Sequence, residues 1–112
     1  MKYKVDERDT LIANTKVCYR HLKVQEKPLS GLVLGDFANA LKKVADVGTF
    51  GAIKHEPSGW KTMEDNKDKI YDKLWRHLLD YASGQYYDVE SGQSQLAHVA
   101  WNVLALLELE HE

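Results

Sequence analysis

The chain has 112 residues, and its 15 Lys and Arg residues nearly balance its 17 Asp and Glu residues, giving a formal net charge of −2. This balance argues against a protein that coats nucleic acid through bulk charge, so no nucleic-acid polymer is expected as a partner. No apolar run approaches membrane-spanning length, and no apolar core follows the N-terminal lysines, so neither a membrane span nor a secretory signal is expected. The single cysteine, Cys18, cannot form an internal disulfide, which favours a cytoplasmic location.

The near-neutral total hides an uneven distribution of charge. Residues 1–27 hold seven basic and four acidic residues, a local charge of +3, whereas residues 28–112 hold eight and thirteen, a local charge of −5. In most proteins, charged residues like these lie on surfaces that are exposed to solvent and have no further role. An acidic body that binds a polyanion would need a divalent cation between them.

The N-terminal arm, residues 1–26, has a pattern that fits two structures. Residues 17–22 alternate as a strand would, whereas Leu11, Cys18 and Leu22 fit one face of a helix. Periodicity does not decide between these alternatives. The arm is therefore predicted as a segment of uncertain structure that precedes a helical domain.

That domain, residues 27–112, is expected to begin with a break at residues 27–31, where proline and glycine favour a turn. Apolar residues then recur at helical spacing over residues 37–52, with Asp36 as the expected N-cap. Gly48 within this helix would either weaken it or allow another element to approach closely.

Two further helices are expected, at about residues 64–83 and 93–109, because apolar stripes recur there at spacings of three and four. Gly84 is a suitable C-terminal stop for the first of them. The three helices carry wide apolar faces. The sequence therefore predicts an all-α fold, a small helical bundle completed by homo-oligomerisation.

Polar residues interrupt these apolar faces near the loop that joins the last two helices. If the two helices are antiparallel, two imidazoles and several carboxylates come together there, from His77, Asp80, Asp88, Glu90, Gln95 and His98. Carboxylates can bind Mg²⁺, and an imidazole can act as a general base or contact phosphate. The alternative is that these are structural residues, with Asp88 and Glu90 capping the last helix.

A second acidic group recurs at helical spacing between residues 65 and 72. Asp65, Asp68 and Asp72 share one face of the predicted 64–83 helix. The face could serve as a carboxylate ladder for a metal, but the interleaved lysines favour a solvated surface.

An ordered series of short motifs resembles a known phage and bacterial family over about residues 27–110. The motifs are Lys27-Pro28-Leu29, Val44-Ala45-x-Val47-x-Thr49-Phe50-Gly51-Ala52-x-Lys54, Gly59-Trp60, Arg76-His77-Leu78-Leu79, Gly84, Asp88-x-Glu90-Ser91-Gly92 and Leu96-Ala97-His98-x-Ala100-x-Asn102. The family is that of dATP/dGTP diphosphohydrolases, of the N-terminal domain type.

The resemblance implies a largely helical nucleotide pyrophosphohydrolase. Its substrate would be a purine deoxynucleoside triphosphate, which a metal-activated water would cleave to the monophosphate and pyrophosphate with Mg²⁺ or Mn²⁺. A phage-encoded protein of this kind would act in the host cytoplasm. A nucleotide ligand and a homo-oligomer are therefore the expected partners.

The resemblance also implies roles for individual residues. Those implied for substrate binding are Lys54 at the phosphates, Trp60 on the purine, Arg76, Gln95 and Asn102. Those implied for catalysis are Glu90, His98 and His77, with Asp88 and Glu90 as metal ligands. The family commonly has a histidine where this chain has Gln95, which cannot accept a proton. This departure motivates the alternative of a non-catalytic nucleotide-binding module, such as a phage protein that sequesters a host nucleotide; a plain helical interaction protein is a third reading.

Overall fold

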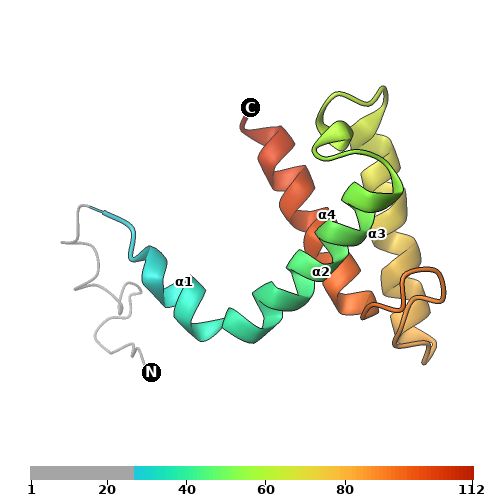
Figure 1. The fold of residues 1–112 in the computed structure, drawn as a ribbon, viewed down its shortest axis with the longest axis horizontal. Helices are drawn as coiled ribbons and strands as arrows, with labels where there is room; N and C mark the ends of the chain where they lie inside the picture. The colour runs from blue at the N-terminus through green and yellow to red at the C-terminus, as the bar shows by residue number, and fades with distance from the viewer. Residues whose placement is uncertain (1–26) are drawn as a thin grey trace, which may run out of the picture. The chain divides into compact units, whose positions relative to one another are not determined.

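A computed structural model describes residues 27–112 of the chain. Within these residues the elements are α1 (Ser30–Asp36), α2 (Ala38–Lys54), the short 3₁₀ helix η2 (Gly59–Lys61), α3 (Asn66–Ala82) and α4 (Gln95–Glu110) (Figure 1). The described residues contain no strand, only an isolated antiparallel bridge. The all-α fold class is therefore confirmed.

Contacts divide the chain into two units, Met1–Val33 and Leu34–Glu112. The predictions made for residues 1–26 lie outside the described residues. No helix within residues 27–112 is both long and apolar enough to cross a membrane.

The start of the helical domain differs from the prediction. Residues 27–29 are non-helical, as the predicted break requires, but α1 already begins at Ser30, and Asp36 is the last residue of α1 rather than an N-cap. Phe37 interrupts the helical path with φ −117° and ψ 25°, and no side chain caps α2.

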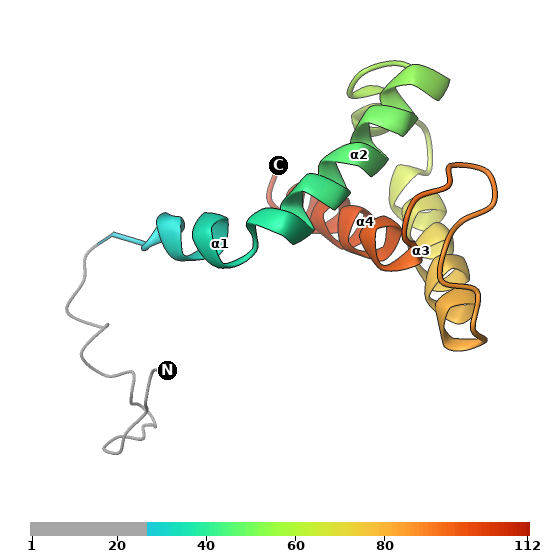
Figure 2. The same cartoon turned by 60° about the horizontal axis from the view of Figure 1, so that its bottom comes forward.

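Helix α4 packs against both α2 and α3 (Figures 1 and 2). The α2 contact depends on Gly48, because a Cβ atom built there would lie only 3.2 Å from the indole Nε1 of Trp101. A Cβ atom built at Gly51, by contrast, would meet nothing within 4 Å. Of the two expected roles for Gly48, the structure therefore supports close approach.

The α3–α4 pair supplies most of the buried side chains. The apolar residues that are buried within the described part of the chain are small in number: Val47, Ile70, Ala97 and Ala105. Helix α4 also buries three polar side chains, those of Gln95, His98 and Asn102. Because buried polar groups need hydrogen-bond partners, these three residues require an explanation.

Candidate functional site

The loop between α3 and α4 is folded by backbone hydrogen bonds that return the chain to the start of α4. The Asp88 N–H group donates to the Gln93 carbonyl at 2.8 Å, and the Gln95 N–H group donates to the Tyr86 carbonyl at 2.9 Å. Gly92 adopts φ 72°, a left-handed conformation that costs glycine little. This fold brings the acidic tip of the loop beside the first turn of α4.

Ser91 joins Asp88 to His98. Asp88 Oδ2 accepts hydrogen bonds from the Ser91 N–H group and from Ser91 Oγ, both at 2.8 Å, and Ser91 Oγ lies 2.7 Å from His98 Nε2. Because the only hydroxyl hydrogen of Ser91 is directed at Asp88, His98 must donate its Nε2 hydrogen to Ser91 Oγ. Asp88 and Glu90 were predicted as possible caps of α4, but no side chain caps this helix. Asp88 is linked through Ser91 to His98 instead.

His77 on α3 lies against His98 on α4. The two rings stack with centroids 4.2 Å apart and an interplanar angle of 11°. His77 Nδ1 lies 2.6 Å from Gln95 Oε1, and since an amide oxygen can only accept, His77 carries a hydrogen on Nδ1. Thus Gln95 fixes the tautomer of His77.

The surroundings of Asp88 and His98 favour an ionised carboxylate beside a neutral imidazole. Burial acts to raise the pKa of Asp88, but the two Ser91 hydrogen bonds and the nearby imidazoles outweigh it, so the pKa lies below its ordinary value. Burial, followed by the proximity of His77, lowers the pKa of His98. His98 is therefore neutral near pH 7 and able to accept a proton.

Two lysines bring positive charge to the same region. Lys54, at the end of α2, forms an ion pair with Glu90 on the loop, and both side chains are well exposed to solvent. Lys73 lies on α3 one turn before His77, and its pKa is lowered by burial and then by Lys54 and Arg76. Lys73 was not predicted as a site residue, because it stands among the interleaved lysines that favour a solvated surface. Its i to i+4 spacing from His77 was the available signal.

The set of residues Lys54, Lys73, His77, Asp88, Glu90, Ser91, Gln95 and His98 is called the polar cluster below. One member has an unused hydrogen-bond donor: Gln95 is fully buried, and its Nε2 atom has no partner among the described residues. Such an orphaned donor costs free energy, on the order of 1–3 kcal/mol, unless a water molecule or a ligand accepts from it. The cluster is therefore incomplete as a purely structural network.

The polar cluster does not form a ready-made metal site. Among residues 27–112, no group of three or more His, Cys, Asp or Glu side chains is arranged to hold a metal ion. Asp88 Oδ2 is occupied by Ser91, and Glu90 is paired with Lys54. The carboxylate oxygens of this pair that remain are Glu90 Oε1 and Asp88 Oδ1, and Asp88 Oδ1 lies 4.0 Å from His77 Nδ1. These residues do not fit a resident Mg²⁺ ion as they stand.

The remaining predicted site residues lie apart from the polar cluster or support it from outside. Asn102 is buried and donates to the His98 carbonyl at 2.8 Å, so it braces the turn of α4 that carries His98. Arg76 is exposed on α3. Asp65, Asp68 and Asp72 are exposed too, in agreement with the solvated reading.

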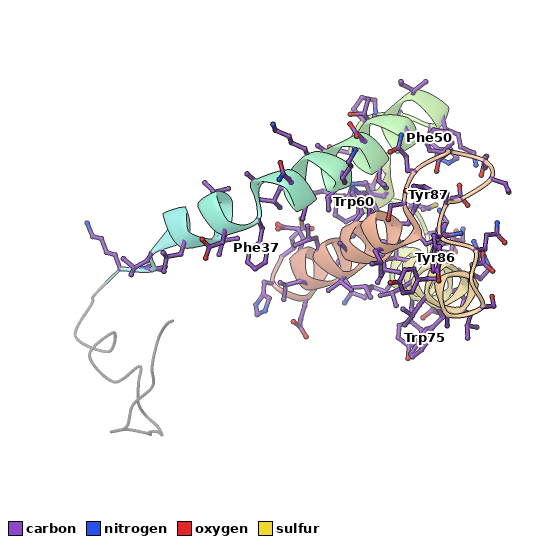
Figure 3. All side chains as sticks on the ribbon, turned by 90° about the horizontal axis from the view of Figure 1, so that it is seen from below. Phe37, Phe50, Trp60, Trp75, Tyr86 and Tyr87 are labelled. Atoms are coloured by element: carbon purple, nitrogen blue, oxygen red, sulfur yellow. The ribbon has the colours of Figure 1, made fainter. Side chains whose placement is uncertain are left out.

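Trp60 lies elsewhere, in a groove between α2, η2 and α4 (Figure 3). Its ring meets Trp101 edge to face, with centroids 5.3 Å apart. The groove has a volume of about 530 Å³, and no member of the polar cluster lines it. Trp60 thus folds back onto the helices, as isolated tryptophans commonly do, and the structure does not bring it to the polar cluster.

Comparison with known proteins gives one family. Residues 19–112 match the family described as dATP/dGTP diphosphohydrolase, N-terminal. The match begins eight residues before the resemblance deduced from motifs, so residues 19–26 of the predicted arm fall inside the family's span. No curated protein and no solved structure matches the chain.

Proposed function

Because the chain belongs to the dATP/dGTP diphosphohydrolase, N-terminal family, we propose that it hydrolyses a purine deoxynucleoside triphosphate at the polar cluster. Family membership is the observation that carries this proposal, since residues 19–112 include every member of the cluster. Water would attack the α-phosphorus, the bond from that phosphorus to the bridging oxygen would break, and pyrophosphate would leave.

The lysines are suited to receive the triphosphate. Lys73 is partly buried with a lowered pKa, so an anion beside it would offset the cost of its desolvated charge. Lys54 is held by Glu90, and a phosphate group would compete with that carboxylate for its ammonium group. Gln95 Nε2, an orphaned donor buried inside the cluster, offers a hydrogen bond to a water molecule there.

The imidazoles are suited to take the proton from water. His98 is neutral at pH 7, and its Nε2 hydrogen is committed to Ser91, so Nδ1 is its basic atom. His77 commits Nδ1 to Gln95, which leaves Nε2 as its basic atom. Asp88 stabilises the imidazolium that would form, because its ionised carboxylate lies 3.8 Å from His98 Nε2.

Magnesium enters this proposal with the substrate. A triphosphate binds Mg²⁺ through its own oxygens, and the ion then needs only one or two protein carboxylates. Asp88 Oδ1 and, once released from Lys54, Glu90 are the oxygens on this chain that could meet it.

A non-catalytic nucleotide-binding module is the second candidate. Two observations favour it: the described residues contain no ready-made metal site, and Glu90 is neutralised by Lys54. A protein that only sequesters a nucleotide would need the cations and the Gln95 donor, but it would need neither a metal nor a base.

Product analysis separates the two candidates. The purified full-length chain is incubated with dATP or dGTP and Mg²⁺, and nucleotide binding and pyrophosphate release are measured in parallel. Release of equal amounts of monophosphate and pyrophosphate, lost in His98→Ala but kept in His111→Ala, supports the enzyme. His111 is the matched control because its side chain is exposed at the end of α4. Binding without release supports the module, and neither binding nor release contradicts both.

A further inference from the structure

The ion pair between Lys54 and Glu90 places a carboxylate where the proposed function needs a phosphate group. Lys54 is the last residue of α2, and Glu90 lies in the loop between α3 and α4, 36 positions further along the chain. Lys54 Nζ donates a hydrogen bond to Glu90 Oε2. Among residues 27–112, no other ion pair joins this loop to α2. An anion that binds Lys54 must therefore replace this contact.

The backbone of the loop holds Glu90 beside Lys54. The Gly92 N–H group donates to the Asp88 carbonyl at 2.8 Å, and the Ser91 N–H group donates to Asp88 Oδ2, also at 2.8 Å. Glu90 lies inside the turn that these bonds close, whereas its side chain is exposed and has no partner besides Lys54 among the described residues. The turn therefore keeps the carboxylate within reach of Lys54, and rotation of the side chain alone would release it.

Lys73 adds a second cation to the same region. It is half-buried on α3, and its pKa is lowered by burial and then by Lys54 and Arg76, whereas Glu90 acts in the opposite sense. Effects between charges weaken with distance, so these side chains lie in one neighbourhood. The charges that influence Lys73 are three cations, the third being Lys69, and a single carboxylate. This excess of cations favours an anion. We call Lys54 and Lys73 together the anion site.

The ion pair is weak enough for a ligand to displace it. The Lys54 and Glu90 side chains are 44% and 58% exposed, and water weakens the attraction between exposed charges. Such a pair lowers the affinity of a competing anion by about two- to sixfold, because only the open fraction of the protein binds it. Glu90 would also repel an anion already bound beside it. Both effects weaken anion binding, and neither prevents it.

We propose that Glu90 is an internal competitor at the anion site, which pairs with Lys54 while the site is empty and gives way to a phosphate group. The identity of the anion, the phosphate chain of a nucleotide, rests on the proposed function. Because pyrophosphate is the product of that reaction, Glu90 would recapture Lys54 whenever a phosphate contact opens, which favours release of the product. Glu90 thus lowers affinity, although a metal ligand at this position would raise it.

Binding of pyrophosphate to the full-length chain, measured by isothermal titration calorimetry in EDTA, tests this proposal. The chelator removes divalent ions, so Glu90 cannot act as a metal ligand, and binding of pyrophosphate requires neither turnover nor recognition of a base. We expect Glu90→Gln to bind pyrophosphate about fivefold more tightly than the wild type. Lys54→Gln and Lys73→Gln should each bind it about tenfold more weakly, because each variant loses one cation of the anion site.

Two comparisons show whether the effect arises from the contact with Lys54. Glu110→Gln makes the same change of charge on an exposed side chain at the other end of α4, and it should leave the affinity within about twofold of the wild type. Glu90→Gln in the Lys54→Gln background should tighten binding by no more than about twofold, since the ion pair is already absent.

Several results would overturn the proposal. Unchanged or weaker binding in Glu90→Gln would show that Glu90 does not compete with the anion. Equal tightening in Glu110→Gln would assign the effect to net charge, and equal tightening in the Lys54→Gln background would exclude the ion pair as its cause. Undiminished affinity in Lys54→Gln or Lys73→Gln, or no binding in any variant, would exclude the anion site.

Failure of this proposal can be told apart from failure of the proposed function. Release of pyrophosphate from dATP or dGTP, with no change of pyrophosphate affinity in Glu90→Gln, would overturn only the role of Glu90. Tighter binding of pyrophosphate in Glu90→Gln, with no release from any nucleotide, would overturn only the hydrolysis.

Discussion

Ser91 is the residue on which the geometry of the polar cluster depends most. Its hydroxyl group donates to Asp88 and accepts from His98, so one side chain fixes the carboxylate and the imidazole together. The sequence does not indicate either of these two hydrogen bonds, because a serine next to an Asp-x-Glu sequence is more typical of a helix cap. At the scale of single residues, the cluster is therefore a hydrogen-bonded network rather than a set of independent side chains.

Removing this hydroxyl group should destabilise the fold measurably. Ser91→Ala leaves the partly buried Asp88 carboxylate with only the backbone N–H donor and leaves His98 Nε2 without an acceptor. We expect a loss of about 1–3 kcal/mol in the free energy of unfolding, measured by urea denaturation. Ser83→Ala, at the exposed end of α3, should cost no more than about 1 kcal/mol. Equal losses in both variants would contradict the role of Ser91.

The lowered pKa of His98 predicts how stability depends on pH. The folded protein resists protonating His98, whereas the unfolded chain takes up that proton near the ordinary pKa of 6.5. The unfolded state therefore binds more protons below that pH, so stability should fall as the pH decreases from about 7 to 5. Thermal unfolding across this range should show a weaker decline in His98→Gln than in the wild type, with His111→Gln as control. A decline of the same steepness in His98→Gln would show that His98 is not responsible.

At the scale of the elements, the two glycines of α2 have different roles. A Cβ atom at Gly48 would lie 3.2 Å from the Trp101 indole, closer than ordinary van der Waals contact, whereas Gly51 faces open space. The contact between α2 and α4 therefore depends on one of these glycines and not on the other.

Substitution of these two glycines tests this difference. Gly48→Leu should destabilise the protein by about 1–3 kcal/mol, because the new side chain must displace Trp101. Gly51→Leu, on the same helix, should be neutral or stabilising by up to about 1 kcal/mol, since leucine favours the helix over glycine. Thermal unfolding monitored by circular dichroism measures both changes. Similar values at the two positions would contradict the packing described for α2 and α4.

The sequence allowed prediction of the elements whose periodicity is long and regular. The α3 and α4 helices, and the meeting of His77, Gln95 and His98 across their loop, follow from helical spacing and an antiparallel connection. Helix α1 could not be predicted, because seven residues with two glycines give no periodic signal. The N-cap assigned to Asp36 was wrong for the same reason, since it presupposed that no helix ended there.

Individual side-chain partners were less predictable than their positions. Charge alternation on α3 concealed Lys73, whose partial burial is not marked by any local pattern. The pairing of Glu90 with Lys54 joins residues 36 positions apart, so no local pattern could indicate it. For Trp60, the resemblance implied a purine as its partner, whereas in the structure its ring packs edge to face on Trp101.

At the scale of the whole molecule, the α3–α4 pair presents two different sides. One side carries the polar cluster, next to the end of α2, and the other carries exposed apolar side chains, among them Trp75 and Val103. Residues 28–112 carry a local charge of −5, and within them Lys54 and Lys73 bring positive charge to the polar cluster. The account therefore predicts one preferred position for a nucleotide on the described part of the chain.

Imidazole NMR tests that position most directly. Signals of the histidine rings are followed while a non-hydrolysable dGTP analogue and Mg²⁺ are added to the full-length protein. The account predicts that the signals of His77 and His98 move together and saturate, while those of the exposed His55 and His111 stay in place. Saturating shifts at His55 or His111 with no change at His77 and His98 would contradict it.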